Sequence, residues 1–146
     1  MITDSITKKI NEAMKAHDEI RLSTLKLLSS ALNYEFIEKQ HKLSEEEELV
    51  VVMREAKKRK EAIEAYQKAG AQDRAEKEQK ELEILQEYLP AEIDEKDLEK
   101  LVDEAISYLK PSGMQDMGKV VGWVKEKTKG AADGSKIAQL VKSKLV

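Results

Sequence analysis

A repeated pattern of glycine and lysine near the C-terminus is the part of this sequence best suited to hold phosphate groups. Its residues are Gly118, Gly122, Lys125 and Lys129. At about 100° per residue, a helix places all four on one flank. Each glycine inside a helix costs about 1 kcal/mol relative to alanine, so close approach of another group must compensate. That group is either a second helix or a phosphodiester backbone beside the two lysine ammonium groups.

The turn that follows adds a second set of candidate residues. Gly130 suits the left-handed residue that ends a helix, and Asp133 suits the N-cap of a last helix. The first backbone N–H groups of that helix could also hold a phosphate, with Lys136 and Lys142 pointing outward. The predicted nucleic-acid-binding residues are Gly118, Lys119, Gly122, Lys125, Lys129, Gly130, Asp133, Gly134, Lys136 and Lys142.

Charge is distributed unevenly along the chain. From Lys110 to Val146 there are 8 Lys against 3 acidic residues, a balance of +5. The other 109 residues carry 18 Lys and Arg against 26 Asp and Glu, which brings the whole chain to −3. This segregation predicts a polyanion site at the C-terminal end. The run from Lys57 to Lys60 is also basic, but glutamates flank it. We interpret it as a solvated helix face, with a nucleic-acid contact as the alternative.

Catalytic patterns are missing from the sequence. It contains no cysteine, which excludes disulfides, thiolate nucleophiles and cysteine-based zinc sites. It contains no phosphate-binding glycine loop and no dinucleotide fingerprint. Glu38 and His41 match the Glu-x-x-His motif of di-metal bundles, but those sites need the motif twice. We therefore predict no catalytic residue, no metal site and no cofactor.

Composition predicts an all-α protein. Ala, Leu, Glu, Lys and Gln are abundant, Gly and Pro are few, and no segment alternates as a strand does. No stretch approaches the roughly 18 apolar residues of a membrane span, and no basic and apolar leader opens the chain, so we expect a cytoplasmic protein without membrane contact. Apolar spacing predicts helices at about residues 4–17, 19–39, 44–70, 72–87, 94–109, 116–128 and 133–145.

Several residues predict where these helices begin and end. Ser44 and Glu47 have the spacing of a capping box, and Gly70 is a natural stop. Pro90 breaks the helical pattern, after which Asp94 can cap a new helix. We therefore predict an N-terminal four-helix unit, residues 1–90, and a three-helix C-terminal domain, residues 91–146. The alternative is one continuous bundle in which Pro90 is only a turn.

Two apolar surfaces extend beyond a simple core stripe. The helix at 19–39 carries one apolar arc through Leu28 and Phe36 and a second through Leu27 and Tyr34, which is typical of a central helix. Trp123 lies away from both the core stripe and the glycine flank of its helix. It either fills a contact between domains or stacks on a nucleobase.

Three segments resemble the YqeY-like family. They are RLSTLKLLSSAL at residues 21–32, EILQEYLP at residues 83–90, and the tail pattern Gly118, Gly122, Lys129, Gly130, Asp133 and Gly134. The match extends over essentially the whole chain. The family shares its C-terminal unit with the tail domain of the B subunit of tRNA-dependent amidotransferases, the GatB/YqeY relationship. The resemblance implies an N-terminal helical bundle, and a C-terminal domain that contacts tRNA rather than performing chemistry.

The resulting hypothesis is a non-catalytic helical protein that binds tRNA through its basic C-terminal domain. It would work in systems related to tRNA-dependent amidotransferases, which are carbon–nitrogen ligases with glutamine as amido donor. The alternative is an adaptor whose glycines seat a helix of a synthetase or an amidotransferase component. A third hypothesis, a catalytic subunit of amide transfer, lacks any region resembling the amidotransferase catalytic body.

Overall fold

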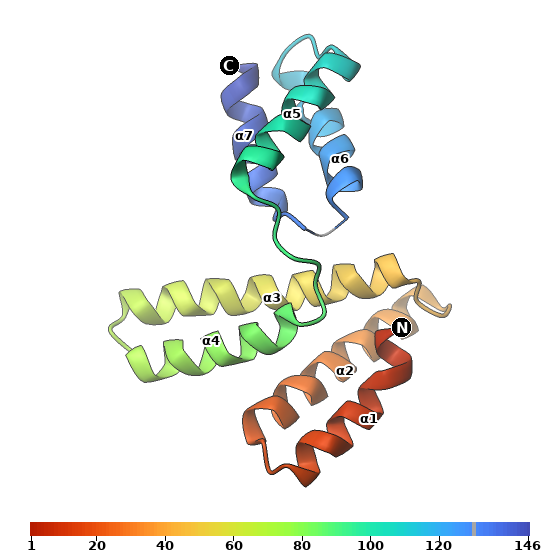
Figure 1. Cartoon of the computed structure of the whole chain (residues 1–146), viewed down its shortest axis with the longest axis vertical. Helices are drawn as coiled ribbons and strands as arrows, with labels where there is room; N and C mark the ends of the chain where they lie inside the picture. The colour runs from red at the N-terminus through yellow and green to blue at the C-terminus, as the bar shows by residue number, and fades with distance from the viewer. Residues whose placement is uncertain (130) are drawn as a thin grey trace. The chain divides into compact units, whose positions relative to one another are not determined.

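The computed structural model describes residues 1–129 and 131–146, and every regular element within them is a helix (Figure 1). The elements are α1 (Ile2–Lys15), α2 (Glu19–Lys39), α3 (Glu45–Lys68), α4 (Gln72–Gln86), α5 (Glu95–Leu109), the 3-10 turn η1 (Met114–Asp116), α6 (Met117–Thr128) and α7 (Gly134–Leu145). The predicted all-α class is confirmed. The helix ends agree with the predicted ranges to within a few residues.

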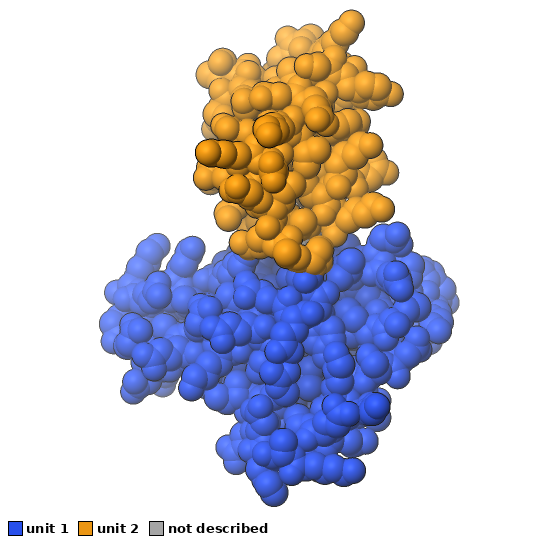
Figure 2. Space-filling model, in the orientation of Figure 1, with its two compact units in different colours: residues 1–89 blue, residues 90–146 orange. Residues whose placement is uncertain are grey.

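The chain divides into two units, each with its own apolar core. Unit 1 comprises Met1–Leu89 and unit 2 comprises Pro90–Val146, coloured separately in Figure 2. Unit 1 contains α1 to α4 and unit 2 contains α5 to α7. That each unit folds alone, as a domain does, stays a prediction.

Unit 1 is built from two helix pairs. α1 packs on α2 and α3 packs on α4, while α2 also contacts α3 and α4 (Figure 1). Aliphatic side chains from all four helices, together with Leu43, form the main core. Its buried members are Ile6, Leu28, Leu32, Leu43, Val51, Val52, Ala56, Ile63, Leu82 and Leu85. The Ser44 capping box is confirmed, because Ser44 Oγ accepts from the Glu47 N–H while Glu47 accepts from the Ser44 N–H.

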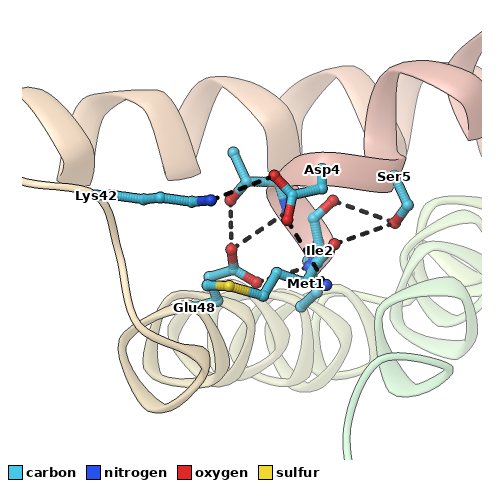
Figure 3. Close-up of polar contacts among 7 residues, drawn as sticks. Met1, Ile2, Asp4, Ser5, Lys42 and Glu48 are labelled. Carbon is cyan, nitrogen blue, oxygen red and sulfur yellow. Dashed lines mark hydrogen bonds and ion pairs between the residues drawn. The ribbon is translucent and has the colours of Figure 1, made fainter.

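A buried carboxylate joins the start of α3 to the start of α1. Glu48 is 1% exposed and accepts hydrogen bonds from the Ile2 N–H at 2.7 Å and the Thr3 N–H at 3.3 Å (Figure 3). The Thr3 hydroxyl donates to the same carboxylate. Nearby, Lys42 Nζ lies 3.7 Å from Asp4 Oδ1. Glu48 thus accepts hydrogen bonds from N–H groups that have no partner within α1. Its negative charge also interacts favourably with the positive end of the α1 dipole.

Arginines match the other buried carboxylates of unit 1. Arg54 Nη1 donates to Glu35 Oε2 at 3.1 Å. Arg59 Nε lies 3.0 Å from Glu81 Oε2 and 3.6 Å from Glu78 Oε2, at the contact between α3 and α4. The basic run at residues 57–60 is therefore divided, because one member is turned inward to balance two glutamates. Lys57 and Lys58 are exposed, and Lys58 Nζ lies 3.1 Å from Glu55 Oε1.

α2 is the central helix of unit 1, as predicted, because it contacts α1, α3 and α4. Its buried arc contains Leu25, Leu28 and Leu32, each at most 2% exposed. Phe36, at the end of that arc, is 47% exposed. In the second arc Ile20 and Ala31 pack against the cores, whereas Leu27 is 51% exposed and Tyr34 69% exposed. The spacing of apolar residues around a helix does not show which members of each arc the other helices cover.

Unit 2 is a three-helix arrangement in which α5, α6 and α7 contact one another. Its buried core is Leu98, Val102, Ala105, Val120, Val124, Ala132, Ile137 and Val141. Ile93 packs against this core, and its N–H donates to the Ala131 carbonyl at 2.8 Å. Asp94 occupies the N-cap of α5, but its side chain makes no capping hydrogen bond, so that part of the prediction was wrong.

Candidate nucleic-acid interface

The two glycines of α6 lie on open surface. Gly118 and Gly122 are both exposed, and a Cβ atom added at either one would meet nothing within 4 Å outside its own helix backbone. Helix packing within the described residues therefore gives no reason for glycine at these positions. With Lys125 and Lys129, which the helical repeat places on the same flank, they form what we call the glycine–lysine face.

The lysines of this face are not engaged by carboxylates. Lys125 and Lys129 are exposed, and neither makes an ion pair with a described residue. Lys119 differs, because its Nζ lies 3.9 Å from Asp116 Oδ1. Hydrogen bonds from the backbone N–H and the hydroxyl of Ser112 lower the pKa of Asp116 and keep it ionised. Lys119 is thus the partly neutralised member of the predicted set.

The lack of a side chain at Gly134 makes room for Lys125 beside α7. A Cβ atom on Gly134 would lie 2.8 Å from Lys125 Cε and 3.1 Å from Lys125 Nζ. The absent side chain therefore lets the lysine lie against the first residue of α7, where the helix dipole is positive. An ammonium group beside the positive end of a helix repels it, and a bound anion would relieve that repulsion.

The turn between α6 and α7 has one expected cap and one unexpected residue. Asp133 Oδ1 accepts from the Ser135 N–H at 3.0 Å, so the predicted N-cap is confirmed. This carboxylate takes one of the N–H groups that a phosphate would otherwise use. Lys129 has a left-handed φ of 44° and ends α6. Gly130, which we predicted in that role, lies outside the described residues.

The lysines of α7 do not form one stripe. Lys136 and Lys142 are both exposed, but a separation of six residues places them about 120° apart around the helix. At most one of these two lysines can therefore point to the same side as the glycine–lysine face. Lys144 is engaged elsewhere, because its Nζ lies 2.8 Å from Asp103 Oδ1, and this contact raises the pKa of the lysine.

Charge within unit 2 is balanced as a whole and divided by helix. Residues 90–146 contain 10 Lys and 10 Asp and Glu, whereas residues 90–109 alone contain 7 acidic residues and 2 Lys. The prediction of a basic C-terminal domain is therefore corrected in one respect. The basic character belongs to α6 and α7, and α5 is acidic.

The sequence made Trp123 a candidate for stacking on a nucleobase, but its pairing with Tyr108 was not predicted. Tyr108 on α5 is 75% exposed, and its ring centroid lies 6.2 Å from that of Trp123 on α6, with the planes tilted by 33°. Lys127 Nζ lies 5.3 Å from the Trp123 ring centroid. The two rings border a shallow depression with Asp103, Glu104 and Ser107, which we call the aromatic depression. The two aromatic residues stand on different helices, so no periodicity in the sequence links them.

The Glu38 and His41 motif does not gather ligands. His41 Nδ1 lies 2.9 Å from the Lys42 carbonyl oxygen and His41 Nε2 lies 3.5 Å from Glu47 Oε1, so both ring nitrogens contact groups close by in the sequence. Among residues 1–129 and 131–146, no cluster of three or more histidine and acidic side chains is arranged to hold a metal ion.

Comparison with known proteins identifies the family. The family description "Yqey-like protein" matches residues 3–145. The chain belongs to the YqeY-like family. An uncharacterized protein of Schizosaccharomyces pombe is 35% identical over 85 residues, which cover 58% of this chain and 69% of that protein. The mitochondrial protein named altered inheritance of mitochondria protein 41, from Vanderwaltozyma polyspora, is 30% identical over 126 residues, or 81% of this chain and 68% of that protein.

The YqeY-like match extends across both units, so it includes the N-terminal helices as well as the tail pattern. Within the residues that the structure describes, no helix is long and apolar enough to cross a membrane.

Proposed function

We propose that this YqeY-like chain binds structured RNA, with tRNA as the expected class, through the glycine–lysine face and the adjoining start of α7. The observation that supports the proposal best is the open space above Gly118 and Gly122. A phosphodiester strand can approach the α6 backbone there more closely than at any residue with a side chain. Lys125 and Lys129 would neutralise its phosphates, and Lys125 would add to the positive end of α7.

The choice of tRNA rests on the resemblance of the tail pattern to the amidotransferase tail domain. Contacts of this kind read the shape and the backbone of a folded RNA rather than its sequence. We propose a role beside carbon–nitrogen ligase systems that act on tRNA, without amide transfer by the chain itself.

The test is tRNA binding by the full chain at two salt concentrations. Lys125→Glu combined with Lys129→Glu should weaken binding at low salt at least tenfold and reduce its salt dependence, because two phosphate contacts become repulsive. Lys26→Glu combined with Lys68→Glu is the matched control, since it changes net charge equally at two exposed positions of unit 1 outside the basic run at residues 57–60. Equal affinities for the two double variants would contradict the proposal.

The adaptor hypothesis remains the second candidate, and α2 favours it. Leu27, Tyr34 and Ile37 are 51%, 69% and 63% exposed, which is unusual for apolar residues near one another on a helix. The proposed partner is a synthetase or an amidotransferase component. Retention of a protein partner after nuclease treatment, and its loss in Leu27→Asp, would support the adaptor function. Loss of every partner with nuclease would contradict it.

The cellular compartment is a separate proposal. We propose the cytoplasm from the sequence, while the relative from Vanderwaltozyma polyspora carries a mitochondrial name. Fractionation of source cells with an antibody against the chain tests this, and enrichment in an organelle fraction would overturn it.

A further inference from the structure

The aromatic depression is outside the glycine–lysine face and has a different chemistry. At about 100° per residue, Trp123 points roughly 100° away from Gly122 around α6. Tyr108 is 75% exposed, whereas the buried side chains of unit 2 are nearly all aliphatic. A large ring left mostly in solvent beside an indole offers a flat apolar surface, and the phosphate contacts proposed above do not use it.

We propose that the aromatic depression holds one unpaired nucleobase of the bound RNA, stacked on the Tyr108 ring. This inference rests on the proposed RNA-binding function and adds a second contact on the same unit. Bases stack on aromatic side chains in many proteins that bind single-stranded nucleic acid. Single-stranded loops and ends are also the parts of folded RNA whose bases can be turned outward.

The separation of the rings decides where the base lies. Stacked bases are about 3.4 Å apart, so a base between two rings needs about 7 Å between their planes. The Tyr108 and Trp123 centroids are 6.2 Å apart, and the planes diverge by 33°. The base therefore covers the exposed Tyr108 ring rather than entering between the two rings. Lys127 Nζ, 5.3 Å from the indole centroid, supplies an ammonium group for the phosphate of the same nucleotide.

The acidic residues of the depression would select among bases by hydrogen bonds to the edge of the base. Asp103 is paired with Lys144 at 2.8 Å, whereas Glu104 makes no ion pair with a described residue. A carboxylate repels phosphate but accepts hydrogen bonds from the exocyclic amino group of cytosine or adenine. Uracil has no amino group, so the depression should prefer cytosine and adenine to uracil.

Trp123 is the only tryptophan of the chain and reports directly on this site. The experiment titrates the full protein with pentacytidylate and with pentauridylate and follows indole emission. We expect pentacytidylate to quench the emission and to bind several-fold more tightly than pentauridylate. Tyr108→Ala should weaken pentacytidylate binding about tenfold, whereas Tyr34→Ala, at a tyrosine 69% exposed in unit 1, should leave it unchanged.

Glu104→Gln should remove the preference for cytosine without abolishing binding. Quenching that persists unchanged in Tyr108→Ala would overturn the proposal. So would quenching by an acetylated tetra-arginine peptide with no response to either oligonucleotide, which would make the depression a site for a basic protein segment.

Binding of tRNA serves to separate the two proposals. If tRNA binds and Lys125→Glu with Lys129→Glu abolishes that binding, but pentacytidylate causes no quenching, the stacking proposal fails and the RNA-binding function stands. If pentacytidylate quenches the indole emission but tRNA affinity is the same in Lys125→Glu with Lys129→Glu, the stacking proposal stands and the proposed role of the glycine–lysine face fails. If neither ligand binds, both proposals fail.

Discussion

The two units use charged residues in opposite ways. Within the described residues, the buried carboxylates Glu35, Glu48 and Glu81 all belong to unit 1, where arginine or backbone N–H groups meet them. The buried positions of unit 2 are apolar apart from Thr128, and its charges stay on the surface. Unit 1 therefore uses charge to hold helices together. Unit 2 leaves lysines such as Lys125 without a carboxylate partner in the described residues, and these lysines suit a ligand.

Separating the units tests the comparison most severely. We expect fragments 1–89 and 90–146 each to be helical and to unfold cooperatively, because each has its own core. The shorter fragment should be the less stable, since small domains bury a smaller fraction of their surface. Circular dichroism follows both fragments, and indole emission follows the second. A fragment without a cooperative transition would show that the units depend on each other.

Glu48→Ala should have the largest effect of any single substitution considered. It removes a buried acceptor of three hydrogen bonds at the start of α1. We expect it to lower the free energy of unfolding of unit 1 by about 3 kcal/mol. Urea unfolding followed by circular dichroism measures the loss, and the emission of Trp123 in unit 2 should keep its midpoint. Glu45→Ala, an exposed position of the same helix turn, is the control and should cost under about 0.5 kcal/mol.

Gly118→Ala combined with Gly122→Ala should move stability and binding in opposite directions. Because a Cβ atom meets nothing at either position, the double variant should stabilise unit 2 by about 1–2 kcal/mol. The added methyl groups should hold a phosphate strand away from α6 and weaken tRNA binding several-fold. Thermal unfolding followed by indole emission and a tRNA titration measure the two effects. A more stable variant with unchanged tRNA affinity would leave the glycines without a binding role.

The stability of unit 1 should also depend on pH, and this effect should be smaller than those of the substitutions above. Burial, and then the neighbouring Glu78, raise the pKa of Glu81 above its ordinary value of 4.5. The native state therefore binds this proton more tightly than the unfolded chain, and the resulting stability is lost as pH rises through the raised pKa. Arg21 has the opposite effect on Glu87, since its hydrogen bonds lower that pKa. The contribution of Glu87 to stability is therefore present above pH 4.5, and it is lost as pH falls through the lowered pKa of Glu87.

Glu81→Gln should remove the decline above pH 4.5 and leave the acid side unchanged. We expect the free energy of unfolding of unit 1 to be higher below this titration than above it. The measurement is the urea midpoint at a series of pH values. Glu87→Gln should change only the acid side, and a decline that persists in Glu81→Gln would assign it to another group.

Local signals in the sequence predicted much of the fold. The capping box at Ser44, the stop at Gly70 and the N-cap at Asp133 act within a few residues, so short patterns suffice to find them. The covered side of α2 depends on where other helices pack, which is why the exposure of Leu27 and Tyr34 was missed.

The candidate site divides in the same way. The glycine–lysine face follows from helical spacing along one helix. The contact of Lys125 with Gly134 joins two helices across a turn, and the pairing of Tyr108 with Trp123 joins residues from α5 and α6. Such contacts depend on tertiary packing, which no spacing along one helix encodes.

The cap that Glu48 places on α1 also has a consequence for the order of folding. The contact between Glu48 and Ile2 spans 46 residues, whereas α3 and α4 are joined by a three-residue turn at residues 69–71. Because long loops cost entropy to close before their contacts form, the α3–α4 hairpin should assemble first and α1 should dock late. Glu48→Gln should then speed unfolding and leave the refolding rate nearly unchanged. The first helix would be the segment that opens and exchanges its amide hydrogens while the rest of unit 1 stays folded.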